Sequence, residues 1–196
     1  MMPDFKFQEK GHLYTLDGIA IPSVTQVLPD NPHNKDDYSM NRGTLVHKTI
    51  YLYNIGDLDE DTLDEQLKPY LEAYNKFRKD CPDIRGIVEL KSGSPSPTDE
   101  LQVAGYCLLV NAQNPPFSDK PLKGYEVPLY HLSYKYAGII DILELDSLPC
   151  RKAYNLYLSG DGKYDLIDRS KDLRRNESIF LSFLTTYQWK KERGLI

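Results

Sequence analysis

The 196-residue sequence predicts one domain of the α/β or α+β class. Short β-type runs alternate with longer segments whose apolar residues recur every three or four positions, so strands and helices are interleaved. The chain is long enough to bury one substantial core, and no internal repeat or low-complexity tract divides it. We therefore expect an N-terminal hairpin, two helices, and a central set of at least three strands interrupted by a helix.

The N-terminal segment predicts a β-hairpin. Strands are expected at Leu13–Leu16 and Ile19–Ile21, because the Asp17-Gly18 dipeptide between them suits a tight turn. Ser23 and Thr25 are both candidates for the cap of a short helix that follows. The polar residues up to position 41 predict an irregular loop.

Two helices are expected next. From Thr44 onward, Val46, Ile50 and Tyr53 recur at helical spacing, and Gly56 with the acidic run after it ends this segment. The second helix has an apolar stripe at spacings of three and four, formed by Leu63, Leu67, Tyr70, Leu71, Tyr74 and Phe77. A bend is expected at the proline within it.

The central part predicts three strands and a helix. The first strand covers residues 87–91 and is followed by the turn-rich sequence SGSPSPTDE. A helix is expected from Thr98 to about Val110, and strands at Tyr125–Tyr130 and Tyr136–Leu145.

The C-terminal part predicts a hairpin with strands at Ala153–Leu158 and Lys163–Asp168, and a last helix over about Glu177–Arg193. It is basic, with ten Lys or Arg against six Asp or Glu from position 151 onward, although the whole chain has a net charge of -5. The single domain is thus divided into residues 1–41, hairpin and loop; 42–150, the core with the chemical motifs; and 151–196, a basic hairpin and helix.

Composition excludes several classes of protein. The three cysteines show neither zinc-ligand spacing nor an even-numbered disulfide framework, so a reducing cytoplasm is expected. No stretch approaches the roughly 20 apolar residues of a membrane span, and the N-terminus lacks the apolar core of a signal peptide. We expect a cytoplasmic protein with no membrane partner.

The strand IVELKSG presents an acid and an amine on one side. Residues two apart in a strand point the same way, so Glu89 and Lys91 project together while Val88 and Leu90 face the opposite side. Two interpretations stay open at this point: an edge strand with a solvated ion pair, or a metal-dependent phosphodiesterase site.

A second acid, Asp141, lies in the otherwise apolar strand YAGIIDILEL and requires either a salt-bridge partner or a metal. Two carboxylates suffice for a hard cation such as Mg2+, so Asp141 and Glu89 form a candidate pair. His47 is either a satisfied or solvated side chain or a further metal ligand. Gln102 and Tyr106 share a helix face that is expected to border the strand 87–91.

Five motifs together resemble those of the PD-(D/E)XK nucleases, in particular the compact RecB-like exonucleases of phages and prophages. They are RGTLVH (42–47), ELK (89–91), QVAGY (102–106), GYEVPLY (124–130) and GIID (138–141). The opening HLYTLDGIAIPSVTQVL is also similar to the start of those enzymes. The resemblance covers roughly residues 12–110 and 124–141 and implies a restriction-endonuclease-like core, with a central mixed sheet flanked by helices.

The resemblance implies a role for each matching residue. Asp141 and Glu89 would bind catalytic Mg2+ or Mn2+, with His47 as an additional ligand and Glu126 as a supporting acid. Lys91 would be the catalytic lysine. Gln102 and Tyr106 would position DNA and the strand, and Arg42 and Thr44 would meet a phosphate or fix the helix start.

The implied function is a metal-dependent DNA exonuclease that hydrolyses phosphodiester bonds in recombination, repair or phage replication, in a bacterial or phage-infected cytoplasm. Its partners would be DNA and a single-strand-binding protein, recombination protein or helicase. The alternative is a nucleic-acid-binding module or a nuclease-derived inhibitor without turnover.

The motif order departs from the family, because 87–106 here precedes 124–141. Either a unit has migrated within the sheet with the site preserved, or the chain order has been altered, with joins expected near 83–86, 119–124 and 147–152.

Overall fold

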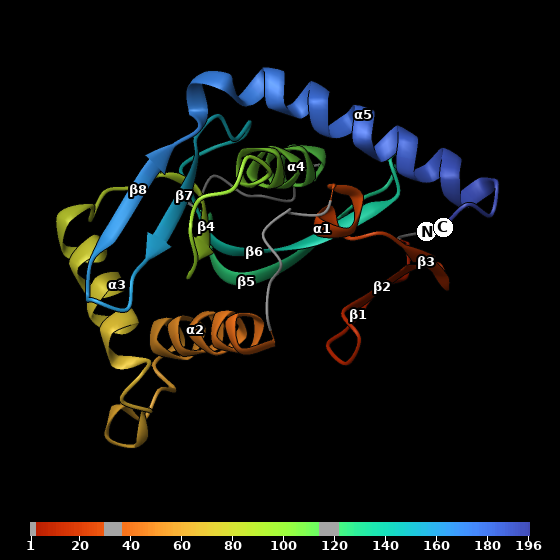
Figure 1. Cartoon of the computed structure of the whole chain (residues 1–196). Coiled ribbons are helices and arrows are strands. Elements are labelled where there is room, and N and C mark those ends of the chain that lie inside the picture. The colour runs from red at the N-terminus through yellow and green to blue at the C-terminus, as the bar shows by residue number, and fades with distance from the viewer. Residues whose placement is uncertain (1–2, 30–36, 114–121) are drawn as a thin grey trace.

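The computed structural model describes residues 3–29, 37–113 and 122–196. A mixed five-stranded sheet lies between helices, and a three-stranded antiparallel sheet, β1-β2-β3, stands at the N-terminal end (Figure 1). This arrangement confirms the predicted fold class. The elements in chain order are β1 (Phe5–Gln8), β2 (Leu13–Leu16), β3 (Ile19–Ile21), α1 (Val24–Val27), α2 (Asp37–Ile55), the 3-10 turn η1 (Glu60–Thr62), α3 (Lys68–Asp80), β4 (Gly86–Lys91), α4 (Asp99–Ala112), β5 (Leu122–His131), β6 (Tyr136–Leu145), β7 (Ala153–Leu158), β8 (Tyr164–Asp168), the 3-10 turn η2 (Ser170–Asp172) and α5 (Leu173–Glu192).

The strand order of the large sheet is β5-β6-β4-β7-β8. β4 is antiparallel to β6 and parallel to β7, and the outer pairs are antiparallel hairpins. The chain leaves β4 through α4, forms the β5–β6 hairpin on one side, and returns to β7 on the other side of β4. The two exchanged blocks are therefore neighbours in the sheet. Of the three expected joins, the one near 119–124 falls largely outside the described residues.

Helices cover both faces of this sheet (Figure 1). One core lies beneath α1, α4 and α5 and contains Val24, Val27, Val103, Leu109, Ile140, Phe180 and Leu184. The other lies beneath α2 and α3 and contains Val46, Ile50, Tyr70, Leu71, Phe77, Val88 and Leu156. Burying one such side chain contributes roughly 1.5–3 kcal/mol, so both helical layers are firmly held. None of the helices in the described ranges is long and apolar enough to cross a bilayer.

Several boundaries differ from the expectations. The helix expected from Thr44 begins at Asp37, and its first residues are largely exposed, so no apolar periodicity marks them. The bend expected at Pro69 is wrong, because α3 begins at Lys68 and a proline in the first turn costs no hydrogen bond. Strand β1, which pairs with β2, was not expected at all. Ser23 caps α1, with its side chain accepting from the backbone N–H of Gln26.

The interpretation of residues 87–91 as an edge strand is also wrong. β4 lies between β6 and β7, and its side chains are buried except at Lys91. A solvated ion pair therefore does not explain the acid and amine on this strand.

The large sheet opens where β4 and β6 separate. Their ladder ends at the pair Val88 and Ile142, whereas β4 stays paired with β7 as far as Lys91. Glu89 follows the last pair on one strand and Asp141 precedes it on the other. The two carboxylates thus face each other at the point of separation, where the β5–β6 hairpin turns away from β4 and β7 (Figure 1).

Candidate metal centre

Asp141 lies at the middle of the site and is buried. Its Oδ2 accepts a hydrogen bond from the backbone N–H of Leu90 at 2.6 Å, which joins β6 to β4. Its Oδ1 lies 3.0 Å from Nδ1 of His47, on α2. A carboxylate inside an apolar strand is therefore tied to a strand on one side and a helix on the other.

Three residues from separate elements converge on one point. His47 of α2, Glu126 of β5 and Asp141 of β6 each offer a ligand atom, and these atoms lie within 4.8 Å of one another. Such a spacing lets one divalent cation contact all three. The residues predicted as ligands from the motifs are thus adjacent in space, although 94 positions separate His47 from Asp141.

The backbone at Glu126 is strained. This residue has φ of +49°, a left-handed conformation that costs a non-glycine residue roughly 1–2 kcal/mol. The neighbours Tyr125 and Val127 pair with β6 in one continuous register, and Glu126 itself lies across from Asp141. Strain of this kind persists where the surroundings enforce it, and it concentrates at functional sites.

Glu89 supplies a third carboxylate, and so a fourth candidate ligand residue, beside His47, Glu126 and Asp141. Its Oε1 accepts from Nε2 of Gln102 at 2.7 Å. Its Oε2 is buried and has no hydrogen-bond partner among the described residues. An orphaned carboxylate oxygen is costly in a protein interior unless a cation or water completes it. This oxygen fits a metal that His47, Glu126 and Asp141 would share with Glu89.

The electrostatics of the site show an excess of negative charge. Burial, followed by the charge of Asp141, raises the pKa of Glu89 to about 8 and that of Glu126 to about 8. Burial lowers the pKa of His47, but the charges of Asp141, Glu89 and Glu126 outweigh it and raise this pKa to about 9. Burial raises the pKa of Asp141, but the charge and hydrogen bond of His47 outweigh it, so this pKa is lowered. Without a cation, the cluster holds protons near neutral pH.

The ammonium of Lys91 is held by three neighbouring side chains. Its Nζ donates to Oε1 of Gln102 at 2.6 Å and lies 3.3 Å from Oε1 of Glu89. A third contact, 3.4 Å to Oδ1 of Asp99, was not foreseen. Burial lowers the pKa of Lys91, but the charges of Glu89, Asp99 and Asp141 outweigh it, so the pKa is raised and the ammonium is retained.

Gln102 connects the lysine to the carboxylates, as the shared helix face predicted. Its Oε1 accepts from Lys91, and its Nε2 donates to Glu89 and to the hydroxyl of Tyr106 at 3.0 Å. Tyr106 packs directly on Gly138 of β6, where an added Cβ would lie 2.6 Å from the Tyr106 ring. Gly138, three residues before Asp141, therefore allows α4 to approach the site closely.

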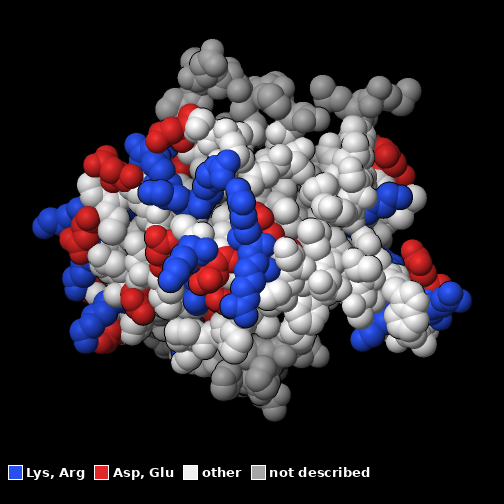
Figure 2. All heavy atoms as spheres, turned by 90° about the horizontal axis from the view of Figure 1, so that it is seen from above, with Lys and Arg blue, Asp and Glu red and all other residues white. Residues whose placement is uncertain are grey.

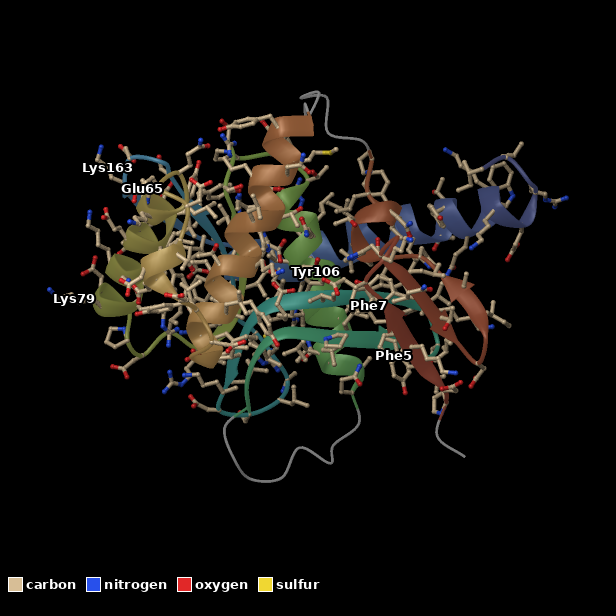
Figure 3. All side chains as sticks on the ribbon, turned by 90° about the horizontal axis from the view of Figure 1, so that it is seen from below. Phe5, Phe7, Glu65, Lys79, Tyr106 and Lys163 are labelled. Atoms are coloured by element: carbon tan, nitrogen blue, oxygen red, sulfur yellow. The ribbon has the colours of Figure 1, made fainter. Side chains whose placement is uncertain are left out.

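Two hollows meet at His47. One is a cleft of about 1010 Å³ lined by Lys91, Asp99, the loop Ser92–Ser94 and Arg42. The other, of about 290 Å³, is lined by the carboxylates Glu89, Glu126 and Asp141 together with Tyr106, His12 and Tyr14. Figure 3 shows Tyr106 between α2 and the N-terminal sheet that carries Phe5 and Phe7. The metal cluster and the lysine can thus be reached from different sides.

Of the two remaining predicted residues, Arg42 lines the cleft and Thr44 does not. Arg42 faces the cleft and its Nη2 donates to the carbonyl of Ser92 at 3.4 Å. Thr44 is exposed and donates to the carbonyl of Met40 within α2, seven residues after the helix begins. Thr44 therefore does not fix the helix start and does not line either hollow.

Sequence reasoning missed Asp99, His12 and Tyr14. Asp99 reads as an ordinary first-turn acid of a helix, and no local pattern indicates that it meets Lys91. Tyr14 belongs to the predicted hairpin and His12 directly precedes it, and their hydrogen bond of 2.8 Å joins two residues of the small hollow. No local pattern indicates this pair, because His12 lies in the turn before β2 with φ of +49°.

No protein-family model matches the chain, and no curated protein matches it in sequence. The three clustered groups of His47, Glu126 and Asp141, with the carboxylate of Glu89 in the same hollow, suit a hard divalent cation, and a fixed ammonium nearby suits an anionic substrate.

Proposed function

We propose that this chain is a metal-dependent deoxyribonuclease, an exonuclease that hydrolyses phosphodiester bonds in DNA recombination, repair or phage replication. The observation that carries the proposal is the orphaned Oε2 of Glu89, buried beside the cluster of His47, Glu126 and Asp141 and next to the fixed ammonium of Lys91. The resemblance of the motifs to RecB-like PD-(D/E)XK nucleases supports the same assignment.

The residues that would hold Mg2+ or Mn2+ are His47, Glu89, Glu126 and Asp141. Carboxylate oxygens suit both ions, and the imidazole favours Mn2+ over Mg2+. When bound, a divalent cation lowers the pKa of a water molecule and neutralises charge on a phosphate. Its charge would also replace the protons that Glu89 and Glu126 hold near neutral pH.

Lys91 is the group of this chain suited to the reacting phosphate. Its side chain is 21% exposed and lines the cleft, so its ammonium can donate to a phosphate oxygen or to the attacking water. An ammonium fixed in advance stabilises charge that develops in the transition state without reorganisation. Gln102 holds this ammonium at 2.6 Å while it also orients Glu89.

The cleft offers contacts for a nucleic-acid strand. Arg42 can meet a phosphate, and Tyr164, which is half-buried and lines the same hollow, is a candidate for stacking with a base. The face that carries α5 is less suitable, because Lys and Arg are interspersed there with Asp and Glu (Figure 2). We place the DNA in the cleft and not along the basic C-terminal part.

The assay is digestion of end-labelled linear DNA, single- and double-stranded, with Mg2+, Mn2+ or EDTA. Wild type is compared with Lys91→Ala and Asp141→Ala, and circular dichroism verifies that each variant is folded. Metal-dependent loss of DNA that both substitutions abolish supports the nuclease. Binding of DNA without cleavage, unchanged by either substitution, contradicts it and favours the alternative of a binding module or inhibitor.

A further inference from the structure

Asp99 places a second negative charge beside Lys91. It is the first residue of α4, it is 6% exposed, and its Oδ1 lies 3.4 Å from the lysine Nζ. Oε1 of Glu89 lies at nearly the same distance from Nζ, 3.3 Å. The ammonium therefore contacts two carboxylates, of which only Glu89 lines the hollow with the metal cluster.

The carboxylate of Asp99 is itself fixed. Its Oδ2 accepts two hydrogen bonds of 2.8 Å, one from the backbone N–H of Ser96 and one from the hydroxyl of Tyr157 on β7. With one oxygen occupied in this way, the other is directed at Lys91. A side chain with both oxygens committed has little rotational freedom, so it fixes what it binds.

A further chain of contacts ties Asp99 to the C-terminal part. Nδ2 of Asn155, a fully buried residue of β7, donates to the backbone carbonyl of Asp99 at 3.4 Å. Nε of Arg169 donates to Oδ1 of Asn155 at 2.9 Å. Residues 153–169, to which the motifs assign no role, thus support the helix end that carries Asp99.

Glu89 and Asp99 lie in different hollows, so their charges act on the Lys91 ammonium at different places. Glu89 lines the small hollow with the cluster, whereas Asp99 and Lys91 both line the large cleft. Oε1 of Glu89 also accepts from Gln102, and its Oε2 is buried without a hydrogen-bond partner among the described residues. Attraction to Glu89 alone would favour a position of the ammonium near the cluster. The added attraction to Asp99 favours a position at the cleft.

We propose that Asp99, clamped by Tyr157 and Ser96, is a positioning residue that fixes the Lys91 ammonium at the cleft for phosphodiester hydrolysis. This inference rests on the proposed nuclease function. Asp99 lies outside the cluster of His47, Glu126 and Asp141 and would act through the lysine.

The first test compares Asp99→Asn with wild type in steady-state cleavage of labelled DNA with Mn2+. An asparagine can still accept from Ser96 and Tyr157 but carries no charge, so the fold is retained. We expect kcat to fall about 10- to 100-fold, with KM within about twofold of wild type. The Mn2+ dissociation constant, measured by calorimetry, should stay near that of wild type. Glu100→Gln is the matched control, because the next carboxylate on α4 faces Arg169 at 3.6 Å and not Lys91.

The second test is a double-mutant cycle. If Asp99 acts through the lysine, Asp99→Asn costs little further activity in a Lys91→Gln background. Tyr157→Phe removes one clamp and should lower kcat by an intermediate factor without changing KM. Additive losses in the cycle would show a role independent of Lys91 and would overturn the inference.

A third measurement needs no cleavage. In metal-free protein, Asp99→Asn should raise the rate at which an acylating reagent modifies Lys91 several-fold, as followed by mass spectrometry, and Glu100→Gln should not. An unchanged rate contradicts the inference. Failure of wild type to cleave any DNA would instead reject the nuclease, whereas cleavage by Asp99→Asn at the wild-type rate rejects only the role of Asp99.

Discussion

The carboxylate of Asp141 accepts the backbone N–H of Leu90 at 2.6 Å, in the place where the ladder between their two strands has ended. The Asp141 side chain thus accepts a hydrogen bond that a backbone carbonyl would accept in a continuous ladder. This bond satisfies a buried N–H while the strands separate, and it leaves room between them for the other acidic side chains. The metal cluster consequently lies at the point where the sheet opens.

We predict that Asp141→Asn separates folding from metal binding. The amide oxygen can still accept from Leu90, so the unfolding temperature should stay near that of wild type. The charge that faces His47 is lost, and we expect Mn2+ affinity to fall by at least about tenfold and cleavage to disappear. Calorimetric titration of Mn2+ and digestion of labelled DNA measure the two effects.

The control for this substitution is Asp146→Asn, because Asp146 is an exposed acid that pairs with Arg85 at 3.0 Å just beyond the end of β6. It should bind Mn2+ like wild type. Equal affinity for Mn2+ in Asp141→Asn and wild type would show that the cluster is not the metal site.

The metal-free protein should lose stability as the pH rises from about 5 to 9. Glu89 and Glu126 have folded-state pKa values of about 8, above the ordinary 4.5, so their contribution is fully present below pH 4.5 and is lost as pH rises through 8. His47, raised from 6.5 to about 9, contributes below pH 6.5 and loses this contribution as pH rises through 9. Urea unfolding in EDTA at several pH values measures the slope.

Two comparisons check the origin of that slope. Glu126→Gln cannot ionise and should flatten the loss of stability between pH 5 and 8. Addition of Mg2+ or Mn2+ at pH 8 should restore stability, because the cation replaces the protons. A free energy of unfolding that rises with pH in EDTA over this range would contradict the charge balance described for the cluster.

Much of this fold could be predicted from the sequence because its signals are local. The strand Tyr136–Leu145 was predicted with the bounds that the structure shows, since a run of apolar residues ends at clear turns on both sides. The helix with Gln102 and Tyr106 was likewise predicted within about two residues, and their shared face does border Glu89. Periodicity is sufficient for elements whose apolar side is buried.

The rest depends on tertiary contacts that no local pattern encodes. The contact of Asp99 with Lys91 requires the loop between β4 and α4 to fold back, and the left-handed backbone of Glu126 arises inside what reads as an ordinary strand. The position of β4 between β6 and β7 likewise cannot be read from chain order. These features fix the geometry of the candidate site.

We predict that Gly138→Ala disturbs the site through Tyr106. The added Cβ would lie 2.6 Å from the tyrosine ring, so the ring must move and its hydroxyl would leave Nε2 of Gln102. We expect a loss of stability of about 1–3 kcal/mol and a lower rate of cleavage per folded molecule. Urea unfolding and the DNA assay measure these effects.

Gly105→Ala is the contrasting control, because its Cβ would lie 2.8 Å from Phe180, in the core between α4 and α5. A similar loss of stability is expected there, with activity retained per folded molecule. If both substitutions lower cleavage in proportion to stability alone, the contact of Gly138 with Tyr106 has no particular bearing on the site.

His47 should determine the preference between metals. It is the only nitrogen donor among the three clustered residues, and imidazole binds Mn2+ better than Mg2+. His47→Ala should therefore weaken Mn2+ more than Mg2+, so the ratio of the two dissociation constants moves toward one. The substitution also removes the partner of Asp141 Oδ1, and this effect weakens both ions alike. Calorimetric titration with each ion separates the two effects, because only loss of the ligand changes the ratio. An equal loss of affinity for both ions would show that His47 does not contact the metal and only orients Asp141.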